Sequence, residues 1–176
     1  MVINMLLGIM SDSHDNMNNV IKAFNIFRDR GIEYIIHLGD IISPFIVRKM
    51  IELRWGQLFV NAVYGNNDGD KVLLRKIFDS IGWKIDNGPR IEEIYGKRVF
   101  LMHGYNGIDF TKTLAYTIAK QKIADIVLYG HTHRPDEKNI DGTLVINPGE
   151  TYGLLYGKAT IAIVDLNKLT VEFIEL

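Results

Sequence analysis

The 176-residue sequence contains no cysteine. Disulfide bonds and thiolate metal sites are therefore excluded, and we expect a reducing compartment, the cytoplasm. The sequence also has no marked excess of one charge, since 20 basic and 21 acidic side chains leave a formal net charge of −1. This balance does not indicate a general binder of nucleic acid or of membranes.

Long hydrophobic runs are absent as well. The apolar segment Met1–Met10 is too short to span a bilayer, and it lacks the basic start and small-residue cleavage site of a signal peptide. We interpret it as a first β-strand. No low-complexity run, long linker or internal repeat interrupts the chain, so its length predicts a single domain over residues 1–176.

Strands and helices alternate in the first half of the chain. The apolar pattern predicts strands at about 3–10, 32–38 and 58–63. Helical spacing, caps and stops predict helices from Met17 to Gly31, from Ser43-Pro44 to Leu53, and from Val72 to Gly82. The second strand is a nearly continuous apolar run, which is typical of a sheet covered on both faces.

The second half of the chain is richer in strands. A helix is predicted at 108–121, and strands are predicted at 90–95, 98–102, 126–129, 138–140, 144–146, 159–165 and 170–174. Asp141-Gly142 and Asn167-Lys168 lie at hairpin turns. Alternating strands and helices followed by hairpins predict two sheets packed together with helices outside.

Polar motifs follow five of the predicted strands. They are Asp12-Ser13-His14, Gly39-Asp40, Gly65-Asn66-Asn67-Asp68, His103-Gly104 and Gly130-His131-Thr132-His133. Sites in α/β folds gather at strand ends. Residues i and i+2 of extended backbone point to the same side, so Asp12 with His14, and His131 with His133, can face one centre.

These motifs predict a metal site. Seven side chains are candidate ligands: Asp12, His14, Asp40, Asn66, His103, His131 and His133. Seven is too many for one tetrahedral ion and suits two ions that share a carboxylate. Imidazole with carboxylate favours Mn, Fe, Ni, Co or Zn over Ca or Mg. Each motif alone is more often a turn or a helix cap, and their occurrence in order strengthens the metal interpretation.

His37 lies inside a strand without a neighbouring ligand, so we interpret it as a packed histidine. The segment Tyr105-Asn106-Gly107 is either a wall of the substrate entrance or a mobile turn. For Tyr152 and Tyr156 we favour packing or self-association, which allows for a homo-oligomer.

The order D-x-H, G-D, G-N-x-D, H-G, G-H-T-H resembles the calcineurin-like metallophosphoesterase superfamily over about residues 7–149. The short length and Asn147-Pro148-Gly149 after a hairpin are similar to its small single-domain archaeal and bacterial phosphodiesterases. The resemblance implies an α/β fold, a four-layer α/β/β/α sandwich of two mixed sheets with helices outside. It also implies a dinuclear metal centre between the sheets.

The resemblance further implies a metal-dependent phosphodiesterase acting on a small phosphodiester. Asp12, His14, Asp40 and His133 would hold the first metal, and Asp40, Asn66, His103 and His131 the second, with Asp40 bridging. The cofactors would be two divalent transition metal ions, with Mn expected first and Ni, Fe, Co or Zn as alternatives. A water or hydroxide between the two ions would attack phosphorus.

One residue departs from the pattern of many relatives, which carry histidine where this chain has Asn67. An amide donates a hydrogen bond but cannot act as a general acid, and losing such an acid typically costs ~10²–10⁴-fold in rate. We expect slow turnover, a good leaving group or another acid. Asp68 is expected to orient a neighbour and Asn147 to play a supporting role, while Glu150 stands where relatives often have serine.

The alternative hypothesis is a scaffold of the same fold that binds metal but catalyses weakly, as in a retromer subunit. Metal content would discriminate the two, because a scaffold should tolerate metal loss without losing its partner.

A P-loop is excluded, since Gly153–Lys158 is one residue short and lacks Ser or Thr after the lysine. Without a lid or second domain, we expect an open site with broad acceptance of diesters.

Overall fold

The computed structural model describes residues 5–176. Its helices are α1 (Met17–Asp29), α2 (Pro44–Glu52), α3 (Lys71–Asp79) and α4 (Ile108–Lys120). Its strands are β1 (Leu6–Met10), β2 (Tyr34–His37), β3 (Phe59–Val63), β4 (Lys84–Asp86), β5 (Arg90–Ile94), β6 (Lys97–Met102), β7 (Ile126–Tyr129), β8 (Pro135–Ile140), β9 (Thr143–Pro148), β10 (Thr160–Asp165) and β11 (Thr170–Glu175). The start of the predicted first strand, residues 3 and 4, lies outside the described residues.

The strands form two mixed sheets. One has six strands in the order β11-β10-β1-β2-β3-β4, and the other has five in the order β5-β6-β7-β9-β8. β1 to β4 run parallel, whereas β10 pairs antiparallel with β1, so the C-terminal hairpin completes the first sheet. In the second sheet β6, β7 and β9 are parallel, and the hairpin partners β5 and β8 lie at its edges.

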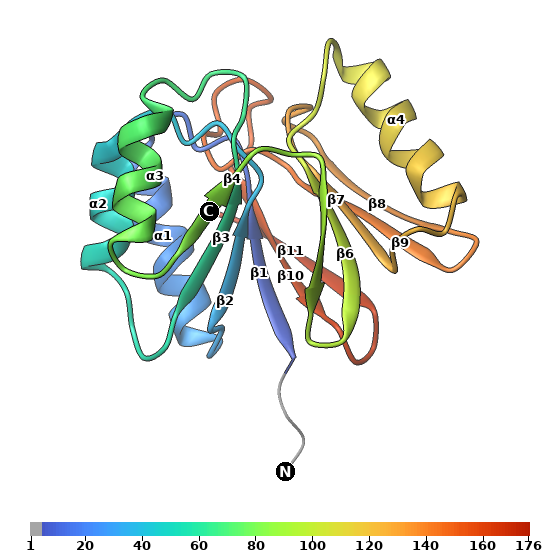
Figure 1. Cartoon of the computed structure of the whole chain (residues 1–176), viewed down its shortest axis with the longest axis horizontal. Helices are drawn as coiled ribbons and strands as arrows, with labels where there is room; N and C mark the ends of the chain where they lie inside the picture. Colours follow the sequence, from blue (N-terminus) through green and yellow to red (C-terminus); the bar gives the residue numbers. More distant parts are fainter. Residues whose placement is uncertain (1–4) are drawn as a thin grey trace.

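The sheets and helices stack in four layers. Helices α1, α2 and α3 cover the outer face of the six-stranded sheet, and α4 covers the outer face of the other (Figure 1). Apolar side chains alternate between layers, because Leu7 and Ile9 pack between the two sheets while Met10 packs under the helices. β6 does the same, with Leu101 between the sheets and Phe100 under α4. The predicted α/β/β/α sandwich is confirmed.

Two strands differ from the sequence-based prediction. β4 was not predicted, because a three-residue strand with one buried side chain, Ile85, is too short to show a period. β8 begins at Pro135 rather than at residue 138. It is a polar edge strand whose charged residues Asp136, Glu137 and Lys138 lack the alternation that marks a half-buried strand.

Five strands end at the same region of the sandwich. β1, β2 and β3 are parallel neighbours in one sheet, and β6 and β7 are parallel neighbours in the other. Each of them is followed by one of the polar motifs.

In the part of the chain that the structure describes, no helix is long and apolar enough to cross a membrane.

The core between α1 and the first sheet generates a stability prediction. Phe27 is fully buried, and its ring packs so closely on β1 that a Cβ added at Gly8 would lie 2.9 Å away. We expect Phe27→Ala to lower the free energy of unfolding by about 3–5 kcal/mol, because it leaves a cavity. Urea unfolding measures this loss.

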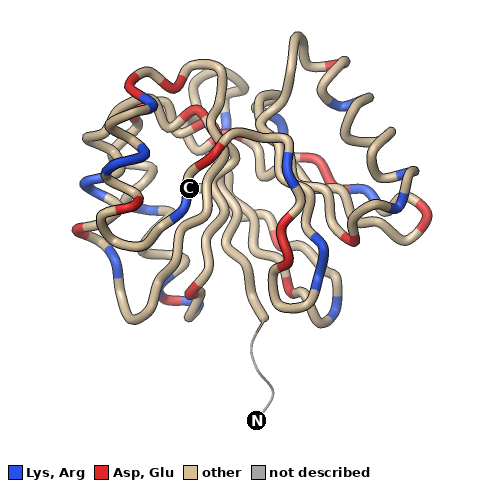
Figure 2. Tube along the Cα trace, in the orientation of Figure 1, with Lys and Arg blue, Asp and Glu red and all other residues tan. Residues whose placement is uncertain are grey.

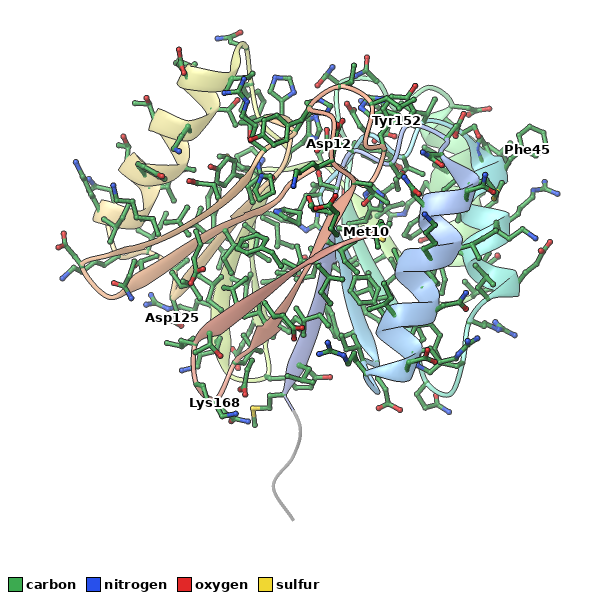
Figure 3. All side chains as sticks on the ribbon, turned by 180° about the vertical axis from the view of Figure 1, so that it is seen from behind. Met10, Asp12, Phe45, Asp125, Tyr152 and Lys168 are labelled. Atoms are coloured by element: carbon green, nitrogen blue, oxygen red, sulfur yellow. The ribbon has the colours of Figure 1, made fainter. Side chains whose placement is uncertain are left out.

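The matched control is Phe45→Ala on α2. Phe45 is 73% exposed and points away from the body of the protein (Figure 3). We expect its truncation to change the free energy of unfolding by less than about 0.5 kcal/mol. Equal losses in the two variants would contradict this account of the core.

Candidate metal centre

The five polar motifs meet where the two sheets approach each other. Five of the seven candidate ligands have left-handed backbone: Asp12 (φ 51°), His14 (41°), Asp40 (56°), His131 (67°) and His133 (61°). Such conformations are uncommon for residues other than glycine and cluster at functional sites. The turns therefore bend the chain so that the side chains after each strand point into a common space.

The first group of ligands comprises Asp12, His14 and His133, whose ligand atoms all lie within 4.8 Å of one another. His14 Nε2 is 3.9 Å from Asp12 Oδ1, and His133 Nε2 is 3.7 Å from the same oxygen. Asp12 Oδ1 and His14 Nε2 are buried without a hydrogen-bond partner among the described residues. Leaving such atoms unpaired costs about 1–3 kcal/mol each, so their chemistry fits a cation.

The second group comprises Asp12, Asp40 and His103. Asn66 Oδ1 lies 3.0 Å and His131 Nδ1 3.3 Å from His103 Nε2, so both join this group. Asp40 Oδ2 is 3.4 Å from His14 Nε2 and 3.5 Å from His103 Nε2. The carboxylate of Asp40 therefore faces both groups, as a bridging ligand must, and Asp12 Oδ1 is also common to both.

Three histidines have one ring nitrogen held by an acceptor outside the cluster. His103 Nδ1 lies 2.7 Å from the Leu38 carbonyl oxygen, and His131 Nε2 lies 2.6 Å from that of Asn106. His133 Nδ1 lies 2.9 Å from the Glu150 carboxylate. Because each acceptor holds a proton on that nitrogen, the other nitrogen faces the cluster and is the one that can bind a metal once it carries no proton.

Glu150 is a functional residue whose role the sequence did not reveal. It is fully buried, and its second oxygen accepts hydrogen bonds from the backbone N–H groups of Leu155 and Tyr156 at 2.9 and 2.5 Å. One carboxylate thus fixes both a candidate ligand, His133, and the loop beside it. A glutamate 17 residues away along the chain gives no local signal of this contact.

The carboxylate of Asp12 is held by hydrogen bonds from one side chain and from the backbone. Asp12 Oδ2 accepts hydrogen bonds from Ser11 Oγ at 2.5 Å and from the His131 backbone N–H at 3.0 Å, which joins the two sheets. Asp12 and Tyr152, from different loops, lie at the same end of the sandwich (Figure 3). A Cβ at Gly130 would lie 2.2 Å from Ser11 Oγ, so only glycine permits this approach.

The buried charges shift one another's proton affinity. Burial raises the pKa of Asp12 despite the opposing effect of His103. For Asp40 burial also acts upward, but contact with His103 and the hydrogen bonds from Asn67 outweigh it and lower the pKa. Burial would lower the pKa of His103, yet Asp40 and Asp12 outweigh it and raise the pKa to about 9. His103 is therefore protonated at neutral pH when no metal is bound.

Asn67 and Asp68 both lie beside the candidate metal centre, and their side chains make hydrogen bonds to other residues of the chain. The Asn67 backbone N–H and side-chain amide donate to the two oxygens of Asp40 at 2.8 and 2.7 Å. Asp68 accepts from the backbone N–H groups of Ile42 and Gly65 at 2.8 and 2.7 Å. Asp68 thereby ties together the turns that carry Asp40 and Asn66.

His37 and Asn147 support the turns from behind. His37 is fully buried, as the sequence indicated, but it also contacts Ser13 Oγ at 3.1 Å through Nε2 and accepts from the Gly39 N–H at 3.3 Å through Nδ1. Burial, followed by the charge of His103, lowers its pKa to about 3, so it is neutral. Asn147 donates to the Gly130 carbonyl oxygen and to Thr132 Oγ1, which holds the second histidine motif.

These donors form a cluster of candidate metal ligands at the ends of the strands, and comparisons with known proteins show the family of the chain. The model of the calcineurin-like phosphoesterase superfamily domain matches residues 5–169. The chain therefore belongs to the calcineurin-like phosphoesterase superfamily. It is 37% identical over 166 residues to a phosphodiesterase of Methanocaldococcus jannaschii, covering 93% of this chain and 95% of the relative.

Solved structures show the same arrangement. A structure described as that of a novel archaeal phosphodiesterase superposes with a TM-score of 0.86 at 36% identity, covering 98% of this chain and 100% of that one. Vps29 of Entamoeba histolytica complexed with Zn²⁺ superposes with a TM-score of 0.65, covering 98% of both chains. Its identity is 19%, so this second likeness concerns the fold alone.

Glu150 generates a prediction about metal affinity. In Glu150→Gln the amide oxygen can still accept from the loop N–H groups, but an amide N–H then faces His133 Nδ1. We expect affinity for Mn²⁺ to fall by about 10–100-fold, the usual effect of losing an outer partner of a histidine ligand. Isothermal titration of the metal-free protein measures it.

The control for this variant is Glu175→Gln, which alters an exposed carboxylate paired with Lys158 at 3.1 Å. We expect its metal affinity to equal that of the unaltered protein. Unchanged affinity in Glu150→Gln would refute the role assigned to Glu150, and a urea unfolding curve separates lost affinity from lost fold.

His103 generates a prediction about pH. Its Nε2 must lose a proton before it can bind a metal, so we expect metal affinity to rise by up to about tenfold per unit from about pH 6.5 to about 9, then to level off. In the metal-free protein the raised pKa stabilises the fold fully below about pH 6.5, and this contribution disappears as pH rises through about 9.

Competitive chelator titrations and urea unfolding at several pH values measure both trends. The metal-loaded protein serves as the control, because a coordinated His103 carries no titrating proton. A metal affinity that is flat between these pH values would contradict the assignment of a charged His103 in the metal-free centre.

Proposed function

We propose that this chain is a metal-dependent phosphodiesterase that hydrolyses small phosphodiesters. The observation that carries the proposal is the pair of candidate ligand groups that share Asp12 and are both faced by Asp40, with Asp12 Oδ1 and His14 Nε2 buried and unpartnered among residues 5–176. The 37% identity to an archaeal phosphodiesterase over most of both chains supports the same activity.

The proposed ligands follow the two groups. Asp12, His14, Asp40 and His133 would hold one ion, and Asp40, Asn66, His103 and His131 would hold the other. We propose Mn²⁺ first, with Ni²⁺, Fe²⁺, Co²⁺ or Zn²⁺ as alternatives, because these ions accept imidazole together with carboxylate. Two such ions would supply an activated water nucleophile and stabilise charge on the phosphoryl oxygens.

The chain's own residues prepare the centre for this chemistry. Asp40 is kept ionised by its contacts with His103 and Asn67, which suits a bridging carboxylate. The Asn67 amide is engaged with Asp40 Oδ2, so we propose that it positions the carboxylate rather than protonating a leaving group. With no acid at this position, we expect esters of acidic alcohols or phenols to react fastest.

The scaffold hypothesis is not favoured. Every predicted ligand position carries a coordinating side chain, and the structure brings all of them to one end of the sandwich. The likeness to Vps29, at 19% identity, reaches the fold and no further. The choice of metal, the cytoplasmic setting, the homo-oligomer and the single-domain organisation remain predictions.

Metal content and turnover test the proposed function together. We expect about two transition metal ions per chain after incubation with Mn²⁺ and metal-dependent release of p-nitrophenol from bis-p-nitrophenyl phosphate. Asp40→Ala and His131→Ala should each lower turnover by more than about 100-fold, since a lost ligand costs more than a lost outer partner.

Asp29→Ala, which truncates a 73% exposed carboxylate on α1, is the control and should retain full activity. Turnover in either ligand variant that equals that of the unaltered protein, or turnover that survives removal of metal, would sink the proposal. Elemental analysis of each variant links lost activity to lost metal.

A further inference from the structure

Two hollows of different character flank the metal centre. One has a volume of about 250 Å³, and its walls include Tyr64, Asn66, Lys71, Asn87, His103 and Tyr105. We call it the lysine pocket. The other has a volume of about 530 Å³ and is lined by His14, Ile42, Asn67, Tyr152 and Leu155. We call it the apolar hollow. Each contains candidate metal ligands, so a diester at the centre would extend one arm toward each.

The walls of the lysine pocket are tied together. The Tyr64 hydroxyl donates to the Lys71 carbonyl oxygen at 3.0 Å, and the Lys71 ammonium lies 5.3 Å from the centre of the Tyr64 ring. From the opposite side, the Tyr105 hydroxyl donates to the Gly88 carbonyl oxygen at 3.1 Å. The pocket is thus built from four segments cross-linked by hydrogen bonds, and it exists before any ligand enters.

Lys71 brings an unneutralised charge to this pocket. No acidic side chain lines it, and Lys71 makes no ion pair among the described residues. Nearby carboxylates are engaged elsewhere, because Asp86 lies 3.4 Å from Arg75 and Asp70 accepts from the Leu73 N–H. Positive and negative side chains otherwise intermingle along the chain (Figure 2). An exposed ammonium without an ion-pair partner, on the wall of a pocket beside the proposed phosphodiester-binding centre, favours an anionic ligand group.

The apolar hollow offers no such partner. It contains neither lysine nor arginine, and its walls include Ile42, Leu155 and Tyr152, whose ring lies 5.4 Å from that of His14. An anionic arm placed there would meet no lysine or arginine side chain. The two arms of a diester are therefore distinguished by charge.

We propose that Lys71 is a specificity-determining residue that binds a second anionic group, a carboxylate or phosphate, on the substrate arm lying beside Asn66 and His103. The preferred substrates are then diesters with one anionic arm and one uncharged arm. This inference rests on the proposed phosphodiesterase function, and it narrows the broad acceptance of diesters expected from the sequence.

A matched pair of substrates tests the inference. Phenyl p-nitrophenyl phosphate has an uncharged second arm, and 4-carboxyphenyl p-nitrophenyl phosphate adds one carboxylate to the same ring. Release of both phenols is followed by chromatography, so the result does not depend on which arm leaves. We expect the manganese-loaded protein to prefer the carboxylated diester by roughly fivefold in kcat/KM, through a lower KM.

Variants of Lys71 test whether this residue causes the preference for the carboxylated diester. Lys71→Ala should bring the ratio of the two kcat/KM values to about one, by lowering kcat/KM for the carboxylated diester. Lys71→Arg should keep the preference, and Lys76→Ala, an exposed lysine further along α3, is the matched control that should keep it as well. Titration with the phosphonate analogues, in which a methylene replaces the scissile oxygen, gives the same ratio without turnover.

The outcomes separate the two proposals. Turnover of the uncharged diester that depends on Asp40, combined with no preference or with a preference that survives Lys71→Ala, overturns the role of Lys71 and leaves the phosphodiesterase function intact. Failure of both diesters to react in any Asp40-dependent way overturns the phosphodiesterase function, and the inference about Lys71 with it.

Discussion

The candidate metal centre is organised around the buried carboxylate of Asp12. Its Oδ2 accepts a hydrogen bond from the His131 backbone N–H and so joins the two sheets, while its Oδ1 is common to both ligand groups and has no hydrogen-bond partner among the described residues. Burial disfavours the charge of this group and raises its pKa. A cation beside Oδ1 would relieve that cost, so metal binding and the joining of the sheets share one side chain.

This arrangement requires very close backbone contacts at the ends of the strands. Gly130 lies against Ser11, and a Cβ at Gly65 would lie 2.1 Å from Asp40 Oδ1. Left-handed backbone at the ligand residues then turns their side chains inward. Strained conformations of this kind persist because the surrounding sheets and the supporting contacts of His37 and Asp68 hold them in place.

The candidate ligands and the walls of the two hollows are positioned by different parts of the fold. The ligands come from turns that directly follow strands, so they are held rigidly and have a recognisable order along the chain. The walls come from the first turn of α3 at Lys71 and from the loops at Tyr105 and Leu155, which meet only in space. Asn67 links the two sets, because it holds Asp40 while lining the apolar hollow.

Sequence alone determined most of the elements and the candidate ligands of this protein, because both leave local patterns. Apolar periods marked most of the strands and helices, and short polar motifs after strands marked Asp12, His14, Asp40, Asn66, His103, His131 and His133. Tertiary structure alone decided the rest. β4 is too short for a period, Glu150 reaches His133 across a loop, and the lysine pocket joins four segments. These features depend on contacts between residues far apart in the chain. Such contacts produce no regular local pattern in the sequence, and this is the physical reason that the sequence does not predict them.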